Sequence, residues 1–500
     1  MIITDYLDEH AVTYSDKLAF SDGKTKVTYT ELQKMARNMA GKIIEFDSNR
    51  RPIAILMGRC TECIVSIFGA IYSGNPYAVL NSATEIEYNI RIINILHPCL
   101  VITDEAGKKK LEEKNIDIPV MEYSDSVECK ADSDKLRNRR NQILFSDPTY
   151  IIFTSGSTGE PKGVVTTYGA VNSFYEMAVR EYGIKDTDVF ANQYALHTVG
   201  PIEDIFYTVR CAATTYIIPS ALFFAPGKLM KFLEEKQVTI INWLPSAMAI
   251  PVHYEALGEA DLSGIRLVTF GGEEMHPSVL RAWMRALPQA TFINAYGSTE
   301  TTELVCRYII DREFEDSEKI PMGVAYPNTR IYIRALGDST FDNEGIGELC
   351  VLGDSLASGY YKNMELTERC FVQNPENNEY PEKMFCTGDL VSLDENNNLI
   401  YRGRKDQQIK RHGYRIELGE IENTAMTMGS IKECACTFNK ETSYISFFYE
   451  GDISENEVMT TLKSIIPGYM LPDRVIRLEE MPHNEGGKID RNELRKQSKG

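Results

Sequence analysis

The stretch Tyr150-Ile-Ile-Phe-Thr-Ser-Gly-Ser-Thr-Gly-Glu-Pro-Lys162-Gly163 decides how the rest of this sequence is interpreted. Its apolar start predicts a buried strand, and a loop of hydroxyl and glycine residues follows and closes on one lysine. Glycines let backbone N–H groups turn toward an anion, hydroxyls add donors, and the lysine adds a positive charge. The stretch therefore predicts a phosphate-binding loop made of Thr154, Ser155, Gly156, Ser157, Thr158, Gly159 and Lys162.

This loop differs from the P-loop of nucleoside triphosphatases, which ends in Gly-Lys-Ser or Gly-Lys-Thr. Here Pro161 precedes the lysine and Gly163 follows it, so a P-loop enzyme is disfavoured. An ordinary Ser/Gly surface turn is the alternative, and the rest of the chain has to decide against it.

The bulk properties predict a soluble, multidomain protein of the cytoplasm. The chain has 500 residues, 43% of them apolar and 25% charged, which exceeds what one hydrophobic core normally serves. A net charge of −19 argues against nucleic-acid binding. The sequence shows neither a signal peptide nor an apolar run long enough to cross a membrane, so no membrane partner is expected. Its 11 cysteines lack a disulfide or zinc spacing, and reduced thiols are expected.

Short apolar strands alternate with amphipathic helices along most of the chain, which predicts an α/β fold with largely parallel sheets. The clearest expected strands are 52–56, 100–103, 216–218, 239–242 and 267–270, and the clearest helices are 30–44 and 229–237.

The pattern changes twice toward the C-terminus. Gly-rich short strands such as 345–351 follow residue 344 and predict a β subdomain. A charged segment at 402–406 then precedes a small α+β unit, with expected helices at 418–428 and 455–466 and expected strands at 433–438 and 444–449. We therefore expect an N-terminal domain at 1–403 and a C-terminal domain at 404–500.

Further motifs accompany the phosphate loop. Asn294-Ala-Tyr-Gly-Ser-Thr-Glu300 follows a strand-like segment and supplies a ring, a glycine turn, a hydroxyl and a carboxylate, which suit adenine, phosphate and Mg²⁺. Thr387-Gly-Asp389 offers a carboxylate for two ribose hydroxyls, although such a tripeptide is more often a simple turn. Gly403-Arg404-Lys-Asp406, Gly413-Tyr-Arg415 and Gly486-Gly-Lys488-Ile-Asp490 complete the series.

In this order, the motifs resemble those of the adenylate-forming superfamily, which includes acyl-CoA ligases, firefly-type luciferases and the adenylation domains of non-ribosomal peptide synthetases. The resemblance extends from Val27-Thr-Tyr-Thr-Glu-Leu32 to Lys488, and 403–422 is most similar to peptide synthetases and D-alanine–carrier-protein ligases. It implies a large N-terminal domain with two mainly parallel sheets, helices and a β subdomain, followed by a small mobile α+β domain.

The resemblance also implies a reaction and its cofactors. A carboxylate attacks the α-phosphate of ATP, forms an acyl-AMP and releases pyrophosphate, with Mg²⁺ bound by Glu300. Two anions must meet in this step, which calls for positive charge and fixed hydrogen-bond donors. Besides the phosphate loop, the implied ATP-binding residues are Gly271, Gly272, Asn294, Ala295, Tyr296, Gly297, Ser298, Thr299, Asp389 and Arg404.

Two implied catalytic positions lie near or beyond the domain boundary. Lys488 bridges the reacting groups during adenylation, and Asp406 is the hinge about which the small domain swivels to present 413–415 for thiol transfer. Thr299 and Glu300 complete the implied catalytic set.

The implied substrate pocket departs from that of enzymes that activate α-amino acids, because Val199 takes the place of the aspartate that binds the α-ammonium. Glu203 and Glu303 suggest instead a cation distant from the carboxylate, as in a β- or ω-amino acid. Alternatively, one or both glutamates face solvent or pair with an arginine such as Arg307. The implied pocket residues are His197, Val199, Gly200, Glu203, Trp243, Val268, Phe270, Ala295, Glu303 and Leu304.

Other substrates and acceptors remain open at this point. His197 and the missing aspartate also resemble aryl-acid ligases, in which Trp243 would stack on a ring. No carrier domain follows, so the expected acceptor is the phosphopantetheine thiol of a separate acyl or peptidyl carrier protein, with coenzyme A as the alternative. A pseudoenzyme that only binds nucleotide is the rival from another class.

Overall fold

The computed structural model describes residues 1–46, 49–126, 129–155, 160–336, 345–405, 408–440, 442–483 and 489–497. The chain divides into two compact units. The first comprises Met1–Asn81, Leu96–Ile152 and Gly163–Lys405, and the second comprises Ser82–Ile95, Phe153–Lys162 and Asp406–Gly500. No described helix is long and apolar enough to cross a membrane.

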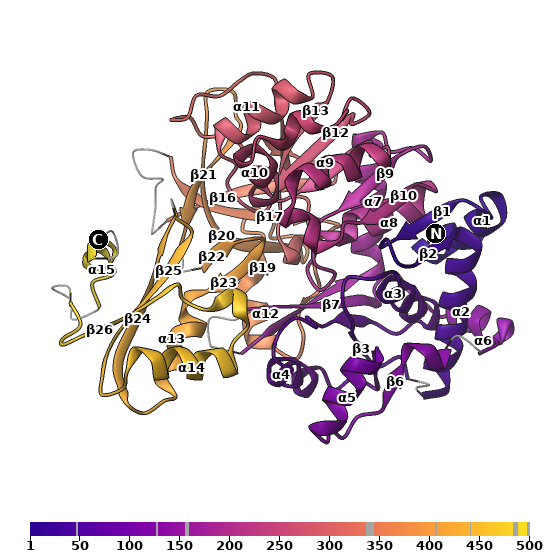
Figure 1. Ribbon diagram of the computed structural model, residues 1–500, viewed down its shortest axis with the longest axis horizontal. Helices are drawn as coiled ribbons and strands as arrows, with labels where there is room; N and C mark the ends of the chain where they lie inside the picture. The colour runs from indigo at the N-terminus through magenta and orange to yellow at the C-terminus, as the bar shows by residue number, and fades with distance from the viewer. Residues whose placement is uncertain are drawn as a thin grey trace. The chain divides into compact units, whose positions relative to one another are not determined.

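Among the described residues, the largest sheet has nine strands, and its central strands run parallel (Figure 1). Parallel strands need crossover connections, which the intervening helices provide. In spatial order the strands are β15 (Val324–Ala325), β14 (Cys306–Ile309), β13 (Thr291–Tyr296), β12 (Leu267–Gly271), β11 (Ile240–Trp243), β9 (Val189–Asn192), β10 (Thr214–Ile217), β1 (Leu18–Ser21) and β2 (Lys26–Thr28).

A second large sheet has seven described strands and is also mainly parallel. Its strands are β18 (Gly359–Tyr360), β8 (Lys162–Thr167), β7 (Pro148–Thr154), β4 (Tyr77–Val79), β3 (Ile53–Leu56), β5 (Leu100–Thr103) and β6 (Val120–Glu122).

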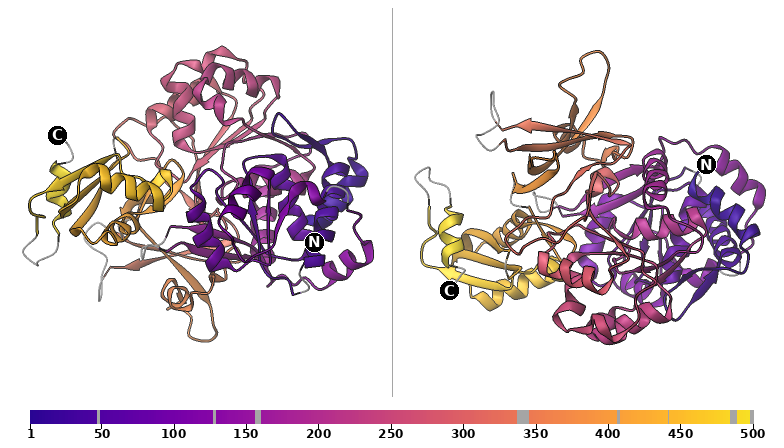
Figure 2. Two further views of the ribbon diagram at one scale, coloured as in Figure 1. Left: turned by 60° about the horizontal axis from the view of Figure 1, so that its bottom comes forward. Right: turned by 90° about the horizontal axis from the view of Figure 1, so that it is seen from above.

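The predicted β subdomain is an antiparallel sheet, which Figure 2 shows in orange as a layer of its own. Its described strands are β16 (Thr329–Ala335), β17 (Gly347–Gly353), β20 (Lys383–Leu393), β19 (Phe371–Gln373) and β21 (Leu399–Arg404).

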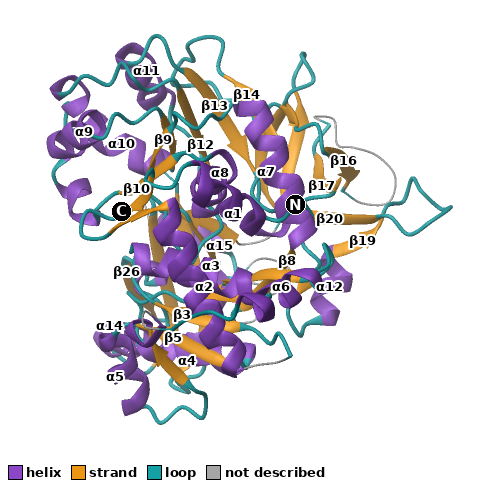
Figure 3. Ribbon diagram, turned by 90° about the vertical axis from the view of Figure 1, so that its right-hand side faces the viewer, coloured by secondary structure: helices purple, strands orange, loops and turns teal. Residues whose placement is uncertain are grey.

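Helices flank the strands of the first unit (Figure 3), and two apolar clusters lie on opposite faces of the nine-stranded sheet. The first cluster combines residues of both large sheets with α1 (Ile3–Thr13), α2 (Tyr29–Phe46), α3 (Thr61–Ser73), α6 (Ser133–Asn141), α7 (Tyr168–Tyr182) and α8 (Pro201–Cys211). The second includes α9 (Pro226–Glu235), α10 (Pro245–His253) and α11 (Pro277–Ala286). The remaining helices up to residue 405 are α4 (Ile86–Leu96), α5 (Glu105–Glu113), α12 (Met364–Cys370), η1 (Tyr123–Ser126), η2 (Ser220–Phe224), η3 (Ala256–Glu259) and η4 (Thr299–Thr301).

The C-terminal part of the second unit is an α+β structure with its own apolar core. Its helix α14 begins where Ser454 caps the backbone N–H of Glu457 and Glu457 returns a hydrogen bond to Ser454. The elements are β22 (Gln408–Arg411), β23 (Tyr414–Glu417), α13 (Leu418–Met426), β24 (Ile431–Asn439), β25 (Tyr444–Gly451), α14 (Glu455–Ile465), η5 (Gly468–Met470), β26 (Arg474–Leu478) and α15 (Arg491–Gln497).

The predicted fold class is confirmed: two mainly parallel sheets with helices, a β subdomain and a small α+β part. The expected strands 100–103 and 267–270 lie within β5 and β12. One helix limit was wrong, because α9 starts at Pro226 and ends at Glu235. Gln237 lies beyond it with a φ of 51°, which a right-handed helix does not allow.

Tyr29 ties the first turn of α2 to the end of α8. Its ring is fully buried, and its hydroxyl lies 2.7 Å from Thr208 O and 2.8 Å from Ala213 O. A buried hydroxyl in this position satisfies carbonyl groups that water does not reach.

We expect Tyr29→Phe to lower the free energy of unfolding by about 1–3 kcal/mol, because buried carbonyls lose their donor. Urea unfolding followed by fluorescence measures this change. Tyr254→Phe, at a tyrosine that is 72% exposed, is the matched control and should leave the transition in place. Equal midpoints for the two variants would contradict the assignment.

Candidate functional site

Asp389 is the centre of a buried cluster in the first unit. It lies opposite Arg404 across β20 and β21, and Arg404 Nη1 donates to Asp389 Oδ1 at 2.8 Å. The Tyr296 hydroxyl donates to Asp389 Oδ2. The side chains of Arg404 and Asp389 are only 8% and 5% exposed, so the ion pair is well shielded from water. Three residues predicted to hold the nucleoside therefore lie together, although they come from separate motifs.

Glu300 follows β13 in the short helix η4 and is fully buried. Tyr360 Oη donates to Glu300 Oε1 at 2.8 Å, and Ala357 N donates to the carbonyl of Glu300 at 2.9 Å. These contacts hold the carboxylate in one orientation beside the end of β13. Thr299, also predicted as catalytic, is buried next to it.

Two glycines permit a close approach of backbone at the carboxyl ends of β12 and β13. A Cβ on Gly297 would stand 1.1 Å from Glu303 O, and a Cβ on Gly271 would stand 2.1 Å from Ala295 O. No side chain fits at either position, so glycine is required for the loop after β13 to fold back on itself. The loop then continues into Glu303, whose φ is 79°.

In the second unit, the ends of the predicted phosphate loop contact the strand β23. Ser155 Oγ donates to Arg415 O at 2.5 Å and accepts from Glu417 N at 3.2 Å. Lys162 Nζ lies 3.5 Å from Glu417 Oε1. The ammonium group of the loop lysine is therefore held where it already pairs with an anionic group, as binding of a phosphate requires.

Glu203 lies in the first turn of α8 and is 4% exposed. Tyr207 Oη donates to its Oε2 at 3.4 Å. Burial, followed by the charges of Glu303 and Asp204, raises the pKa of Glu203 well above its usual value. The structure therefore brings together the two glutamates that the sequence singled out, although 100 positions separate them. Glu203 does not face solvent, and Arg307 forms an ion pair with Glu181.

Asp204 belongs to a buried polar network beneath the nine-stranded sheet. Asn192 Nδ2 donates to Asp204 Oδ2 at 2.9 Å, and Thr269 Oγ1 donates to Asn242 Oδ1 at 3.1 Å. Burial raises the pKa of Asp204 to about 7. Nothing in the sequence distinguishes this aspartate from an exposed residue at the start of a helix.

The remaining pocket residues fall on two faces of the nine-stranded sheet. Trp243, Val268 and Phe270 belong to the second apolar cluster, whereas Val199, Ala295 and Leu304 pack with the first. Trp243 is fully buried, and its Nε1 donates to Ala191 O at 2.8 Å. Its ring lies edge-on to Trp283, with centroids 6.2 Å apart.

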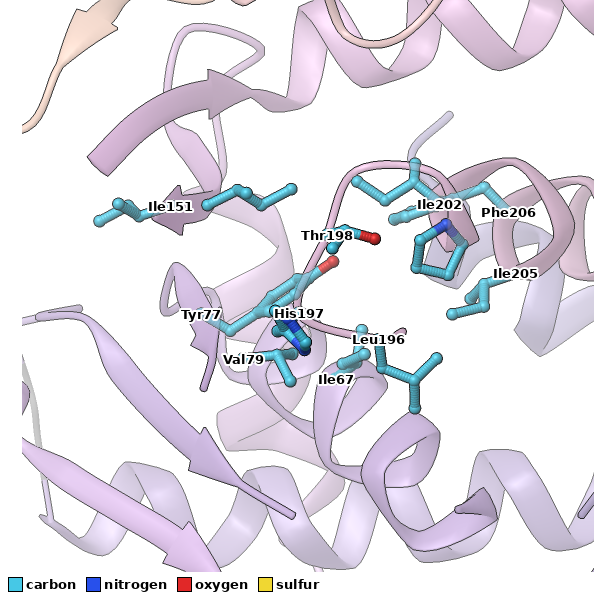
Figure 4. Close-up of a pocket in the computed structure, with 12 residues that line it drawn as sticks. Ile67, Tyr77, Val79, Ile151, Leu196, His197, Thr198, Ile202, Ile205 and Phe206 are labelled. Carbon is cyan, nitrogen blue, oxygen red and sulfur yellow. The ribbon is translucent and has the colours of Figure 1, made fainter. Parts of the chain in front are cut away.

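A small cavity lies on the same face as the first cluster, beside the start of α8 (Figure 4). His197 lines it, and burial lowers the pKa of His197 to about 4, so the imidazole is neutral at pH 7. Gly200, at the N-terminus of α8, packs against the Tyr194 ring, which a Cβ would approach to 2.5 Å. The other lining residues are Ile67, Tyr77, Val79, Ile151, Ile152, Leu196, Thr198, Pro201, Ile202, Ile205 and Phe206.

Comparison with known proteins decides the family. The model of the AMP-binding enzymes matches residues 7–361, which is more than half of the chain. The chain belongs to the AMP-binding enzyme family. It is an AMP-forming ligase of the adenylation-domain type, a class that uses ATP.

Curated relatives of this AMP-binding enzyme include several synthases. Zwittermicin A synthase ZmaJ of Bacillus cereus is 28% identical over 98% of this chain and 94% of its own length. Tyrocidine synthase 3 of Brevibacillus parabrevis is 29% identical over 99% of this chain, which spans only 8% of that synthase. The chain likewise spans 13% of the length of one plipastatin synthase of Bacillus subtilis and 19% of the length of another.

A solved structure confirms the fold of the AMP-binding enzyme. The Vibrio cholerae adenylation domain AlmE, in complex with glycyl-adenosine-5′-phosphate, superposes with a TM-score of 0.84 at 19% identity. The match covers 99% of this chain and 98% of AlmE.

Several predicted residues of the enzyme are placed only by sequence. Gly156, Ser157, Thr158 and Gly159 of the phosphate loop, the hinge Asp406 and the catalytic Lys488 lie outside the described residues. Thr154 ends β7, Ser298 caps η4, Gly272 follows β12 with a φ of 78°, and Asn294 Nδ2 donates to Pro321 O at 2.7 Å.

The residues present fit a Mg²⁺ ion bound with substrate phosphates. Glu300 offers hard carboxylate oxygens and is fully buried, and a buried carboxylate is stabilised by a nearby cation. No cluster of three or more potential metal ligands occurs among the described residues. Mg²⁺ often binds through one or two carboxylates together with phosphates, and this arrangement fits that pattern.

Sequence reasoning missed two residues that position the site. Tyr360 holds Glu300 from β18, and Glu348 on β17 accepts from Gly388 N at 3.2 Å, next to Asp389. Neither lies in a recognisable motif. An alternation of buried and exposed positions marks strands, but it does not indicate which strand residue faces a site.

We expect Asp389→Asn to weaken ATP binding about tenfold or more, because a charge-assisted acceptor for the nucleoside is lost. Isothermal titration calorimetry with ATP measures this without knowledge of the acid substrate. Asp354→Asn replaces an exposed aspartate and is the control. ATP affinity unchanged in folded Asp389→Asn would show that Asp389 does not contact the nucleotide.

We expect Asp204 to make stability depend on pH. Its folded-state pKa of about 7 exceeds that of the unfolded chain, so the folded state retains a proton that the unfolded state releases. The free energy of unfolding should fall as pH rises from about 4 to about 7, by up to about 4 kcal/mol through this group. Asp204→Asn should remove that slope in urea unfolding across a pH series, and an unchanged slope would refute this role.

Proposed function

We propose that this enzyme activates an amino acid whose ammonium group lies away from its carboxylate, as in a β- or ω-amino acid. The product is the aminoacyl-AMP, which is then transferred to the phosphopantetheine thiol of a separate carrier protein. One observation carries the substrate assignment: Glu203, nearly inaccessible to water, lies within the electrostatic influence of Glu303 at the start of α8.

A buried pair of glutamates is costly unless something offsets its charge. Transfer of a carboxylate from water into a protein interior costs several kcal/mol, and two neighbouring carboxylates also repel each other. The raised pKa of Glu203 expresses this cost. A substrate ammonium bound at Glu203 and Glu303 would restore the ionised form and gain charge-assisted hydrogen bonds. The site therefore suits a cation better than a neutral group.

The place of Val199 argues against an ordinary α-amino acid. Its side chain packs against the first apolar cluster, so it offers no carboxylate to an α-ammonium. An ammonium recognised at Glu203 instead belongs to a substrate whose amine and carboxylate are further apart.

The aryl-acid alternative depends on Trp243 and is less well supported. The indole is fully buried, its N–H is already bonded to Ala191, and its face is engaged with Trp283 and Phe223. To stack on a substrate ring, Trp243 would have to leave these contacts, which costs several kcal/mol of packing.

The nucleotide contacts follow from the cluster around Asp389. Asp389 and Arg404 would hold the ribose hydroxyls, Tyr296 would lie against the adenine, and Lys162 would contact the phosphates together with the loop residues. Mg²⁺ bound at Glu300 would neutralise phosphate charge. Lys488 would reach the reacting carboxylate when the C-terminal domain, swivelling at Asp406, closes for adenylation and would leave it for thiol transfer.

We expect ATP–pyrophosphate exchange to respond to β- or ω-amino acids more strongly than to α-amino or aryl acids. Glu203→Gln should raise the KM of the preferred amino acid by about 30-fold or more, because one charge-assisted contact is lost. Its effect on folding should be small, since glutamine is neutral and isosteric with the protonated acid. Glu235→Gln, at an exposed position of α9, is the control.

Three outcomes separate the alternatives. Preference for neutral aryl acids would refute the cation assignment. Exchange with no acid while ATP still binds would support a nucleotide-binding pseudoenzyme. Transfer of the activated acid to coenzyme A in place of a phosphopantetheinylated carrier protein would refute the proposed acceptor.

A further inference from the structure

Two cysteines of the β subdomain face each other across adjacent strands. Cys350 on β17 and Cys386 on β20 are direct partners in the antiparallel register. The Cys350 thiol donates to Cys386 Sγ, and the two sulfur atoms are 3.6 Å apart. A disulfide needs about 2 Å between sulfur atoms and Cα atoms about 4.4–6.8 Å apart, a range that directly paired antiparallel residues satisfy. The pair is therefore within reach of a covalent bond.

The two thiols differ in access and in environment. Cys350 is fully buried, whereas Cys386 is partly exposed. The hydrogen bond from Cys350 is the largest cause that lowers the pKa of Cys386; burial and Glu348 oppose it, and Arg334 and Lys405 add to it. Cys386 is thus the better nucleophile and the one that a small molecule reaches first.

The pair adjoins the turn that presents Asp389. A register shift between β17 and β20 directly follows Cys386, and it contains Thr387, Gly388 and Asp389. Thr387 Oγ1 donates to Leu349 O at 2.8 Å, and Asp389 N donates to Thr387 Oγ1 at 3.0 Å. Any displacement of Cys386 toward Cys350 is therefore passed to the backbone of Asp389.

A buried acid also connects the same turn to Lys405. Glu348 accepts from Gly388 N at 3.2 Å, lies 3.5 Å from Lys405 Nζ and forms an ion pair with Arg334. Movement of β17 against β20 would disturb these bonds as well as the contact of Asp389 with Arg404.

We propose that Cys350 and Cys386 are a modification site at which a peroxide forms a reversible cross-strand disulfide, and that the oxidised enzyme binds ATP more weakly. The Cys386 thiolate attacks one peroxide oxygen, the O–O bond breaks, and a sulfenic acid and hydroxide form. The Cys350 sulfur then attacks the sulfenic sulfur, and a second water leaves as the S–S bond forms. In total, two thiols lose two electrons and two protons, and hydrogen peroxide is reduced to two molecules of water.

The disulfide itself depends only on the geometry of the two strands. Its effect on ATP rests on the proposed role of Asp389 as a nucleoside ligand. The two claims are measured separately, so failure of one is distinguishable from failure of the other.

The intact enzyme is treated with hydrogen peroxide, alkylated and digested without reductant, and its peptides are identified by mass spectrometry. We expect a linked pair of peptides containing Cys350 and Cys386, lighter than their sum by two hydrogen atoms. Dithiothreitol should remove the link. Absence of this pair while other cysteines oxidise would overturn the proposal.

ATP affinity is then compared by calorimetry before and after oxidation. We expect about tenfold weaker binding by the oxidised enzyme, restored by dithiothreitol, which corresponds to loss of one charge-assisted hydrogen bond. Cys386→Ser should abolish the response to peroxide, and Cys370→Ser, at a partly exposed cysteine of α12, should retain it. Because Cys350 is buried, Cys386→Ser is the informative variant should Cys350→Ser fold poorly. A linked pair with unchanged ATP affinity would refute the effect on the nucleotide site, and unchanged affinity in Asp389→Asn would refute the ligand role instead.

Discussion

The shielded ion pair between Asp389 and Arg404 is the interaction on which the nucleotide half of the site depends. A carboxylate with 5% of its side chain exposed is stable in its charged form only beside a cation and hydrogen-bond donors. Arg404 supplies the cation from β21, and Tyr296 supplies a hydroxyl from the end of β13. The same carboxylate thereby joins the nine-stranded sheet to the β subdomain. The turn that carries it is fixed in turn by Glu348 and lies beside the Cys350–Cys386 pair, so nucleotide contact and thiol chemistry share one piece of backbone.

The buried acids of the first unit differ in their neighbours, and the neighbours indicate their use. Asp389 is paired with a guanidinium, which suits a permanently charged acceptor for hydroxyl groups. Glu300 accepts from the neutral Tyr360 hydroxyl, which leaves its charge available to a cation. Glu203 is influenced mainly by burial and by other carboxylates, and its pKa rises accordingly. Perturbed groups of this kind concentrate where a protein binds ligands, because structure alone gives no benefit that offsets their cost.

Much of the fold followed from local pattern. Runs of apolar residues located strands such as β5 and β12 closely, since a strand buried on both faces needs little beyond apolar side chains and turn signals at its ends. The end of α9 was misjudged because apolar spacing continues past Glu235, while the turn at Gln237 depends on backbone geometry. For the site, motif order identified Tyr296, Asp389 and Arg404, and the structure brings them together. Tyr360 and Glu348 escaped notice because strand residues that support a site look like any others.

The sequence by itself determined the class of chemistry, because a glycine- and hydroxyl-rich loop closing on a lysine, together with the ordered motifs after it, already specifies groups that bind a nucleotide. It also singled out Glu203 and Glu303 as unusual. Only the tertiary structure decided that these two glutamates influence each other, that Trp243 lies on the opposite face of the sheet within a separate core, and that Cys350 meets Cys386. The physical reason is that strand register and helix packing are set by side chains far apart in the chain, and burial, charge coupling and sulfur–sulfur distance exist only once those distant segments have met.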